Sequence, residues 1–92
     1  MSGLVDDRIL KLTEALDSGK GLRGMVGRTP LDVESMLSEV VRNIYGLGSR
    51  LDDYLSGVLG KEDTVYDPKQ QLTQGDLHVI RARSLALAHH LG

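Results

Sequence analysis

Residues 33–58 read VESMLSEVVRNIYGLGSRLDDYLSGV, and their apolar side chains recur at alternating spacings of four and three residues. This spacing is typical of a long helix that buries one side against other helices. We call this stripe the helix seam; its members are Val33, Leu37, Val40, Ile44, Leu47, Leu51, Tyr54 and Val58. The seam predicts an all-α fold, a small helical bundle whose second helix is long.

The start of this helix is marked by residues that favour helix N-termini. Thr29 is a favourable N-cap, and Pro30 fits the first turn because its missing N–H is not needed there. Asp32 faces the positive end of the helix dipole. Together with the seam, these residues predict a helix over 30–59.

Two glycines inside the seam leave the length of this helix open. Gly46 and Gly48 each cost about 1 kcal/mol in a helix interior relative to alanine. Ser49 and Asp52 have the spacing of a new capping box, which is consistent with a break near Gly48. Because the seam keeps its spacing across the glycines, one helix over 30–59 is favoured, which gives a bundle of three helices. A break would give four.

The rest of the chain is divided by glycine-rich and polar segments. Thr73 and Asp76 have the spacing of a capping box ahead of an apolar stretch, and Gly19 ends an earlier one. The predicted elements are a helix over 4–17, a glycine-rich loop over 19–28, a polar connection over 60–72 and a helix over 74–90. At 92 residues, the chain is expected to form a single domain, residues 1–92.

The composition indicates a core of aliphatic side chains. Phe and Trp are absent, Tyr occurs 3 times, and 40% of the residues are hydrophobic. A chain this short buries a modest share of its surface, so self-association is an expected source of further stability. Because there is no Cys, disulfides, thiolate metal sites and thiol catalysis are excluded.

The sequence carries no sign of a membrane span or a signal peptide. No apolar run approaches the ~20 residues that a membrane-spanning helix needs. Asp6, Asp7 and Arg8 interrupt the apolar residues near the N-terminus, which is the wrong pattern for a signal peptide. We therefore expect a cytoplasmic protein, of bacterial or phage origin.

No motif predicts catalysis, a cofactor or a metal. Residues 19–24 match the string G-x-G-x-x-G, but a dinucleotide site needs a preceding strand and a parallel sheet. His89 and His90 point about 100° apart on a helix, and His78 lies too far along it to share an ion with them. The adjacent acids at 6–7 and 52–53 also diverge. We expect a protein that is not an enzyme, with no cofactor and no metal site.

The surplus of apolar residues predicts a protein–protein interface. The helix over 30–59 has a second stripe beside its seam, and the helix over 74–90 has a second stripe of Val79, Ala82 and Ala86. A closed bundle could absorb these stripes, or one of them could receive a partner. The expected interface residues are Val41, Ile44, Tyr45, Leu51, Tyr54, Leu55, Val58 and Leu59. The leading hypothesis is a homodimer that binds another protein, as an adaptor, a chaperone or an antiactivator or inhibitor.

Basic residues suggest a second kind of contact. Lys20, Arg23 and Arg28 make the glycine-rich loop locally positive, so an anionic partner could be held there. An alternative function, a nucleic-acid-binding regulator, would use this loop together with Arg81 and Arg83. The net charge of −2 weighs against it, because phosphate contacts need an excess of positive charge. The lack of aromatic residues among these cations also weighs against it, because base stacking needs aromatic side chains.

Overall fold

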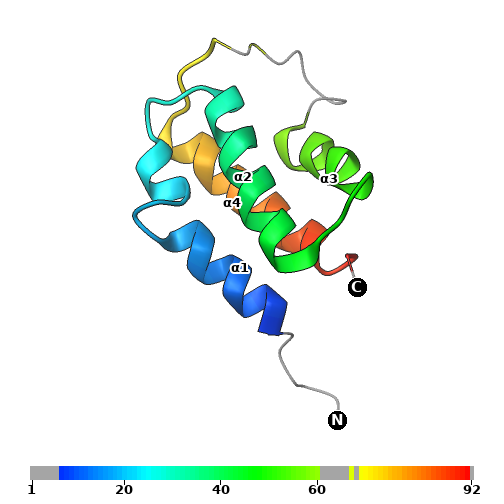
Figure 1. Cartoon of the computed structure of the whole chain (residues 1–92). Helices are drawn as coiled ribbons and strands as arrows, with labels where there is room; N and C mark the ends of the chain where they lie inside the picture. Colours follow the sequence, from blue (N-terminus) through cyan, green and yellow to red (C-terminus); the bar gives the residue numbers. More distant parts are fainter. Residues whose placement is uncertain (1–6, 61–66, 68, 92) are drawn as a thin grey trace.

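Helices make up most of the part of the chain that the structure, a computed structural model, describes: residues 7–60, 67 and 69–91. The elements in order are α1 (Asp7–Asp17), the 3₁₀ helix η1 (Leu22–Met25), α2 (Pro30–Tyr45), α3 (Arg50–Leu59) and α4 (Gln74–Ala88) (Figure 1). No strand occurs among the described residues, which confirms the all-helical fold. None of these helices has both the length and the apolar character needed to cross a membrane.

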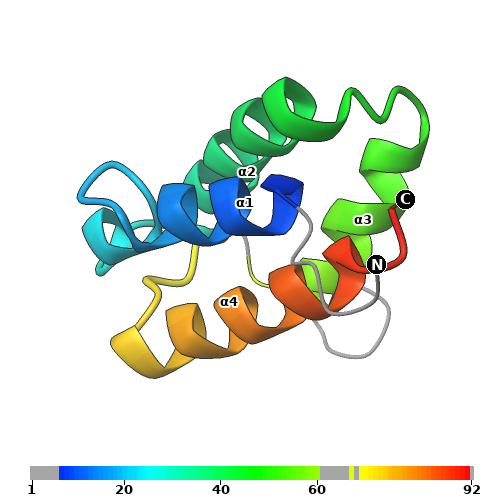
Figure 2. The same cartoon turned by 90° about the horizontal axis from the view of Figure 1, so that it is seen from below.

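The four α-helices form a closed ring around the core. α1 and α3 each pack against both α2 and α4, and η1 touches α1, α2 and α4 at one end. In Figure 2, α4 forms one edge of the molecule, with α1 and α2 on the other side of the interior. The side chains with no exposed surface come from all four helices: Leu12, Leu16, Val33, Leu37, Val41, Val58 and Ser84.

The starts of α2 and α4 are fixed by two identical local devices. The Thr29 hydroxyl accepts the N–H of Asp32, and the Asp32 carboxylate accepts the N–H of Thr29 at 3.1 Å. Thr73 and Asp76 repeat this capping box, with the second bond at 2.9 Å. These backbone hydrogen bonds lower the pKa of both aspartates. Both helix starts are where the sequence predicted them.

The two capped helix starts are held side by side by the backbone. The N–H of Gly27 donates to the carbonyl of Leu72, and the N–H of Leu72 donates to the carbonyl of Arg28, both at 2.9 Å. These bonds join the segment before α2 to the segment before α4. The two helices therefore leave the same end of the molecule, as Figure 1 shows.

The prediction of a single helix over 30–59 is wrong, because a turn separates α2 from α3. Gly46 and Gly48 have φ of 58° and 57°, the left-handed conformation that favours glycine. The N–H of Gly46 donates to the carbonyl of Arg42 at 2.9 Å and so caps α2. The predicted capping box at Ser49 is not formed, since Ser49 makes no side-chain capping bond.

The seam residues keep an inward position even though two helices share them. Val40 and Ile44 are half-buried, and the other six seam residues are buried. Leu47 lies in the four-residue turn between α2 and α3 and still reaches the core. The regular spacing of four and three therefore reflects burial on both sides of the turn and does not require one continuous helix.

The remaining boundaries are close to those predicted. α1 ends at Asp17 as expected, while residues 4–6 of the predicted first helix lie outside the described residues, as do 61–66 and 68 of the polar connection. α4 ends at Ala88, two residues before the predicted end. The predicted loop over 19–28 contains η1, which buries Leu22. Gly21 is required there, since a Cβ on it would lie 2.1 Å from the carbonyl oxygen of Ala15.

Candidate protein-binding surface

The predicted interface residues lie mostly inside the chain's own fold. Tyr45 and Ile44 are half-buried, and the Tyr45 ring lies under the guanidinium of Arg8, 5.0 Å from the ring centroid. The buried ones are Val41, Leu51, Tyr54, Leu55, Val58 and Leu59. The reason is the break at Gly46–Ser49, which lets α3 turn and pack its apolar side against α2 and α4. In the single chain, these six side chains expose less than a tenth of their surface.

Apolar residues remain exposed along the outer face of α4, and singly at Leu10 on α1, Val26 after η1 and Leu31 on α2. Gly75, Val79, Ala82 and Ala86 are all exposed, and Val79 keeps 46% of its surface. At 100° per residue these four fall within an arc of about 60°, on the side of the helix away from the core. We call these four residues the α4 outer face. Three of them form the second stripe that the sequence indicated on this helix.

Charge distinguishes this face from the outer sides of the other helices. Of the exposed residues within α4, only Arg83 carries a permanent charge. By contrast, exposed positions of α2 include Glu39 and Arg42. The four residues of the α4 outer face thus form an apolar stripe between His78 on one side and Arg83 on the other.

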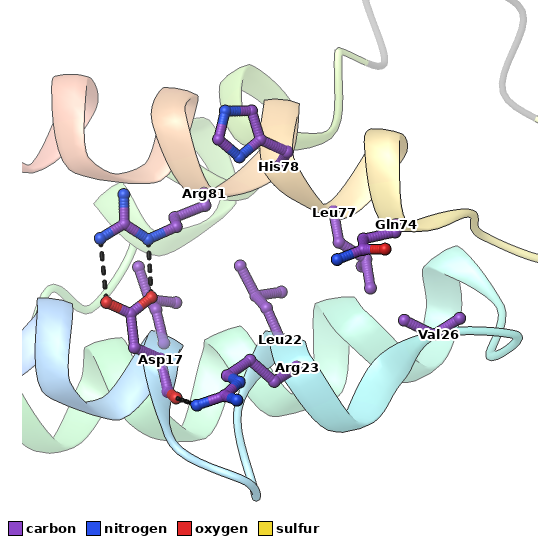
Figure 3. A pocket seen from close by; sticks show the side chains of 9 residues that line it. Asp17, Leu22, Arg23, Val26, Gln74, Leu77, His78 and Arg81 are labelled. Carbon is purple, nitrogen blue, oxygen red and sulfur yellow. Dashed lines mark hydrogen bonds and ion pairs between the residues drawn. The ribbon is translucent and has the colours of Figure 1, made fainter.

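A pocket adjoins this face, between the end of α1, η1 and the first half of α4 (Figure 3). It has a volume of about 220 Å³. Its lining residues are Leu16, Asp17, Leu22, Arg23, Val26, Gln74, Leu77, His78 and Arg81. In Figure 3, Asp17 and Arg81 lie at one end of the pocket, and Val26 and Gln74 lie at the other. The leucines give it an apolar floor, and most of its rim is polar.

An ion pair closes one end of the pocket. Nε and Nη2 of Arg81 donate to the two carboxylate oxygens of Asp17 at 2.6 and 2.9 Å, a bidentate arrangement that joins α4 to α1. The hydrogen bond from Arg81 lowers the pKa of Asp17 and in turn raises that of Arg81. Both side chains remain partly exposed, at 46% for Asp17 and 35% for Arg81, so the pair is accessible from solvent.

The cations of the glycine-rich loop take different positions. Nη1 of Arg23 donates to the backbone carbonyl of Asp17 at 3.4 Å, which brings this residue to the pocket rim. Lys20 is exposed on the turn after α1. Arg28 forms an ion pair with Asp32 at 3.6 Å, four residues away. The structure thus brings Arg23 together with Arg81 and pairs Arg28 locally.

The two arginines of the alternative function point away from each other. Arg81 reaches α1, as described above. A Cβ on Gly60, the C-cap of α3, would lie 2.6 Å from Nη1 of Arg83, so this guanidinium rests against the end of α3, where a cation is favourable. With one arginine on each side of α4, the pair does not form one basic patch.

The other candidate sites are not assembled in the described part of the chain. Among residues 7–60, 67 and 69–91, no three or more His, Asp or Glu side chains gather in a way that could hold a metal ion. His78, His89 and His90 are all exposed. The string at 19–24 forms the turn into η1, with a helix before it where a dinucleotide site needs a strand.

Sequence reasoning missed the pocket and the ion pair that closes it. Asp17 and Arg81 are 64 residues apart, and neither belongs to a motif that would single them out. The available signal was the position of Asp17 on the last turn of a helix and the wide apolar arc of the helix over 74–90.

Comparisons of the chain with protein-family models, curated proteins and solved structures find no match.

Proposed function

We propose that this chain is a non-enzymatic protein that acts by binding another protein, and that it forms a homodimer through the α4 outer face. The observation that carries the proposal is the apolar, almost uncharged outer side of α4. Solvent-facing sides of helices normally carry charged residues, and an apolar stripe at helical spacing is the usual contact surface of a second helix. Adaptors, chaperones and antiactivators or inhibitors all work through surfaces of this kind.

A second copy of the chain fits this face by symmetry. If two α4 helices pack antiparallel around a two-fold axis, Val79 of one copy lies opposite Ala82 of the other, and Gly75 lies opposite Ala86. Each larger residue then faces a smaller one. Small residues also let two helix backbones approach closely, which increases the number of van der Waals contacts. The face is therefore complementary to itself.

The proposed dimer interface differs from the interface expected from the sequence. The residues around Leu51 and Tyr54 stabilise the single chain, and the proposed dimer contact lies on α4. Ile44 and Tyr45, which are half-buried, lie on α2, away from the α4 outer face. The nucleic-acid alternative is less favoured, because Arg81 bonds to Asp17 and Arg83 lies on the opposite side of α4.

A charge placed on this face should separate the two copies. Val79→Glu puts a carboxylate at an exposed position, so the fold is retained, but in a dimer the charge would be desolvated within an apolar contact. We expect the dimer dissociation constant to rise about tenfold or more, as measured by sedimentation equilibrium. Circular dichroism should show unchanged helicity.

The matched control is Ser35→Glu, which places the same charge on the exposed side of α2. It should leave the dissociation constant of the dimer unchanged. If Ser35→Glu weakens the dimer as much as Val79→Glu does, net charge and not the α4 outer face controls association. If Val79→Glu dimerises as well as the wild type, the proposed interface is wrong.

A further inference from the structure

We infer that the pocket between η1 and α4 binds a leucine-sized side chain that lies next to a carboxylate on a partner protein. The inference rests on the proposal that the chain acts by binding a protein, and it specifies the chemistry of that partner. It concerns a different surface from the α4 outer face, so a homodimer can hold a partner at two such pockets.

The floor of the pocket fits an aliphatic side chain. Leu16, Leu22 and Leu77 are buried residues whose side chains line it, and Val26, 55% exposed, extends the apolar surface to its edge. The volume of about 220 Å³ is below the ~300–1,000 Å³ usual for small-molecule sites. A single side chain of a partner can fill it, in the way that anchor residues fill small pockets at protein interfaces.

The rim of the pocket favours a negative group beside that side chain. Arg23 and Arg81 both line it, Lys20 lies on the adjoining turn, and Asp17 is the acidic residue among the lining residues. The rim is therefore positive in a chain whose net charge is −2. This charge difference would orient an acidic segment toward the pocket.

Arg81 can donate a hydrogen bond to such a group and keep its ion pair with Asp17. Its Nε and Nη2 donate to Asp17, and its Nη1 has no hydrogen-bond partner among the described residues. A carboxylate is a better match than phosphate, because the doubly charged phosphate would lie close to the Asp17 carboxylate. A carboxylate bonded to Nη1 of Arg81 leaves the ion pair with Asp17 in place, and the charge of Arg23 on the same rim adds to the attraction.

The pocket can be tested with a small molecule that carries both features. The probe is 4-methylpentanoate, which joins a leucine-like isobutyl group to a carboxylate, and binding is followed through the amide signals of the ¹⁵N-labelled protein. We expect the signals of Leu22, Leu77 and Arg81 to shift, with a dissociation constant on the order of millimolar, as a fragment of this size allows. The neutral alcohol 4-methylpentan-1-ol should bind about three- to fivefold more weakly, because it lacks the charge. Acetate should shift none of these signals.

Variants at the rim test the charge directly. Arg23→Ala and Gln74→Glu, both at exposed positions, should each weaken binding of 4-methylpentanoate about three- to fivefold. Ser35→Glu, on α2 and outside the pocket lining, should not change it. Binding that is insensitive to both rim variants, or equal for the alcohol and the acid, would overturn the inference. Inorganic phosphate that binds more tightly than the acid, at the same signals, would also overturn it.

The same titration separates this inference from the proposed dimer. The variant Ala82→Glu removes the α4 contact and leaves the pocket lining intact. We expect this variant to bind 4-methylpentanoate as tightly as the wild type does. A wild type that dimerises but does not bind the probe contradicts the pocket alone, whereas a monomeric wild type that binds the probe contradicts the dimer alone.

Discussion

At the scale of single residues, the polar contact between Tyr54 and Ser84 joins α3 to α4 in the core. The Tyr54 hydroxyl bonds to the Ser84 hydroxyl and, at 3.2 Å, donates to the Ser84 carbonyl. Ser84 is fully buried and Tyr54 is 3% exposed. Ser84 occupies a core position of α4 because Tyr54 satisfies its hydroxyl; a buried hydroxyl with no partner would cost about 1–3 kcal/mol.

Tyr54 should make the protein sensitive to alkaline pH. Burial raises its pKa from 10.0 to about 12, so between these values the unfolded chain loses the proton while the folded chain keeps it. The stabilisation is complete below pH 10 and is lost as the pH rises through 12. We expect the free energy of unfolding of the wild type to fall by about 2 kcal/mol more than that of Tyr54→Phe between pH 9 and 12.

This difference can be measured by urea unfolding followed by circular dichroism at several pH values. Comparison with Tyr54→Phe cancels the other groups that titrate in the same range. If the two proteins lose stability in parallel as the pH rises, Tyr54 ionises in the folded state and is not buried as described.

At the scale of elements, the sequence predicts the helix starts, which depend on nearby residues, but not the turn between α2 and α3. The capping boxes at Thr29 and Thr73 depend on residues three positions apart, so the sequence alone locates them. The turn at Gly46–Ser49 is not decided by the apolar pattern, because a spacing of four and three looks the same whether one helix or two carry it. What decides it is the packing of α3 against α4, which depends on residues about 30 positions apart, such as Tyr54 and Ser84.

The turn between α2 and α3 predicts whether alanine at its two glycines lowers or raises the free energy of unfolding. Gly46 and Gly48 have positive φ, where alanine costs about 1–2 kcal/mol per residue. The double variant Gly46→Ala and Gly48→Ala should therefore lower the free energy of unfolding by about 2–4 kcal/mol. A continuous helix would give the opposite sign, a gain of about 1 kcal/mol for each alanine.

The control for this pair is Gly19→Ala. A Cβ there meets no atom within 4 Å and its φ is not positive, so the free energy of unfolding should change by less than about 1 kcal/mol. Chemical unfolding of the three proteins under one set of conditions gives the comparison. An increase in stability and in helicity for the double variant would show that the two helices merge.

At the scale of the whole molecule, the ring of four helices explains which apolar surface is left over. Because α1 and α3 each pack against both α2 and α4, the apolar sides of α2 and α3 are used inside the chain. The expected interface residues on those helices could not be separated from core residues by sequence, since both kinds are apolar at helical spacing. α1 and α2 leave single apolar side chains exposed, Leu10 and Leu31, whereas α4 exposes a stripe at helical spacing. This outer face of α4 is the basis of the proposed dimer.

The most direct test of this account is multi-angle light scattering on the purified wild-type protein over a concentration series. The account predicts a mass that rises with concentration toward that of two chains of 10.0 kDa each. The mass of a single chain at every concentration, up to the highest at which the protein stays in solution, would contradict self-association through the α4 outer face.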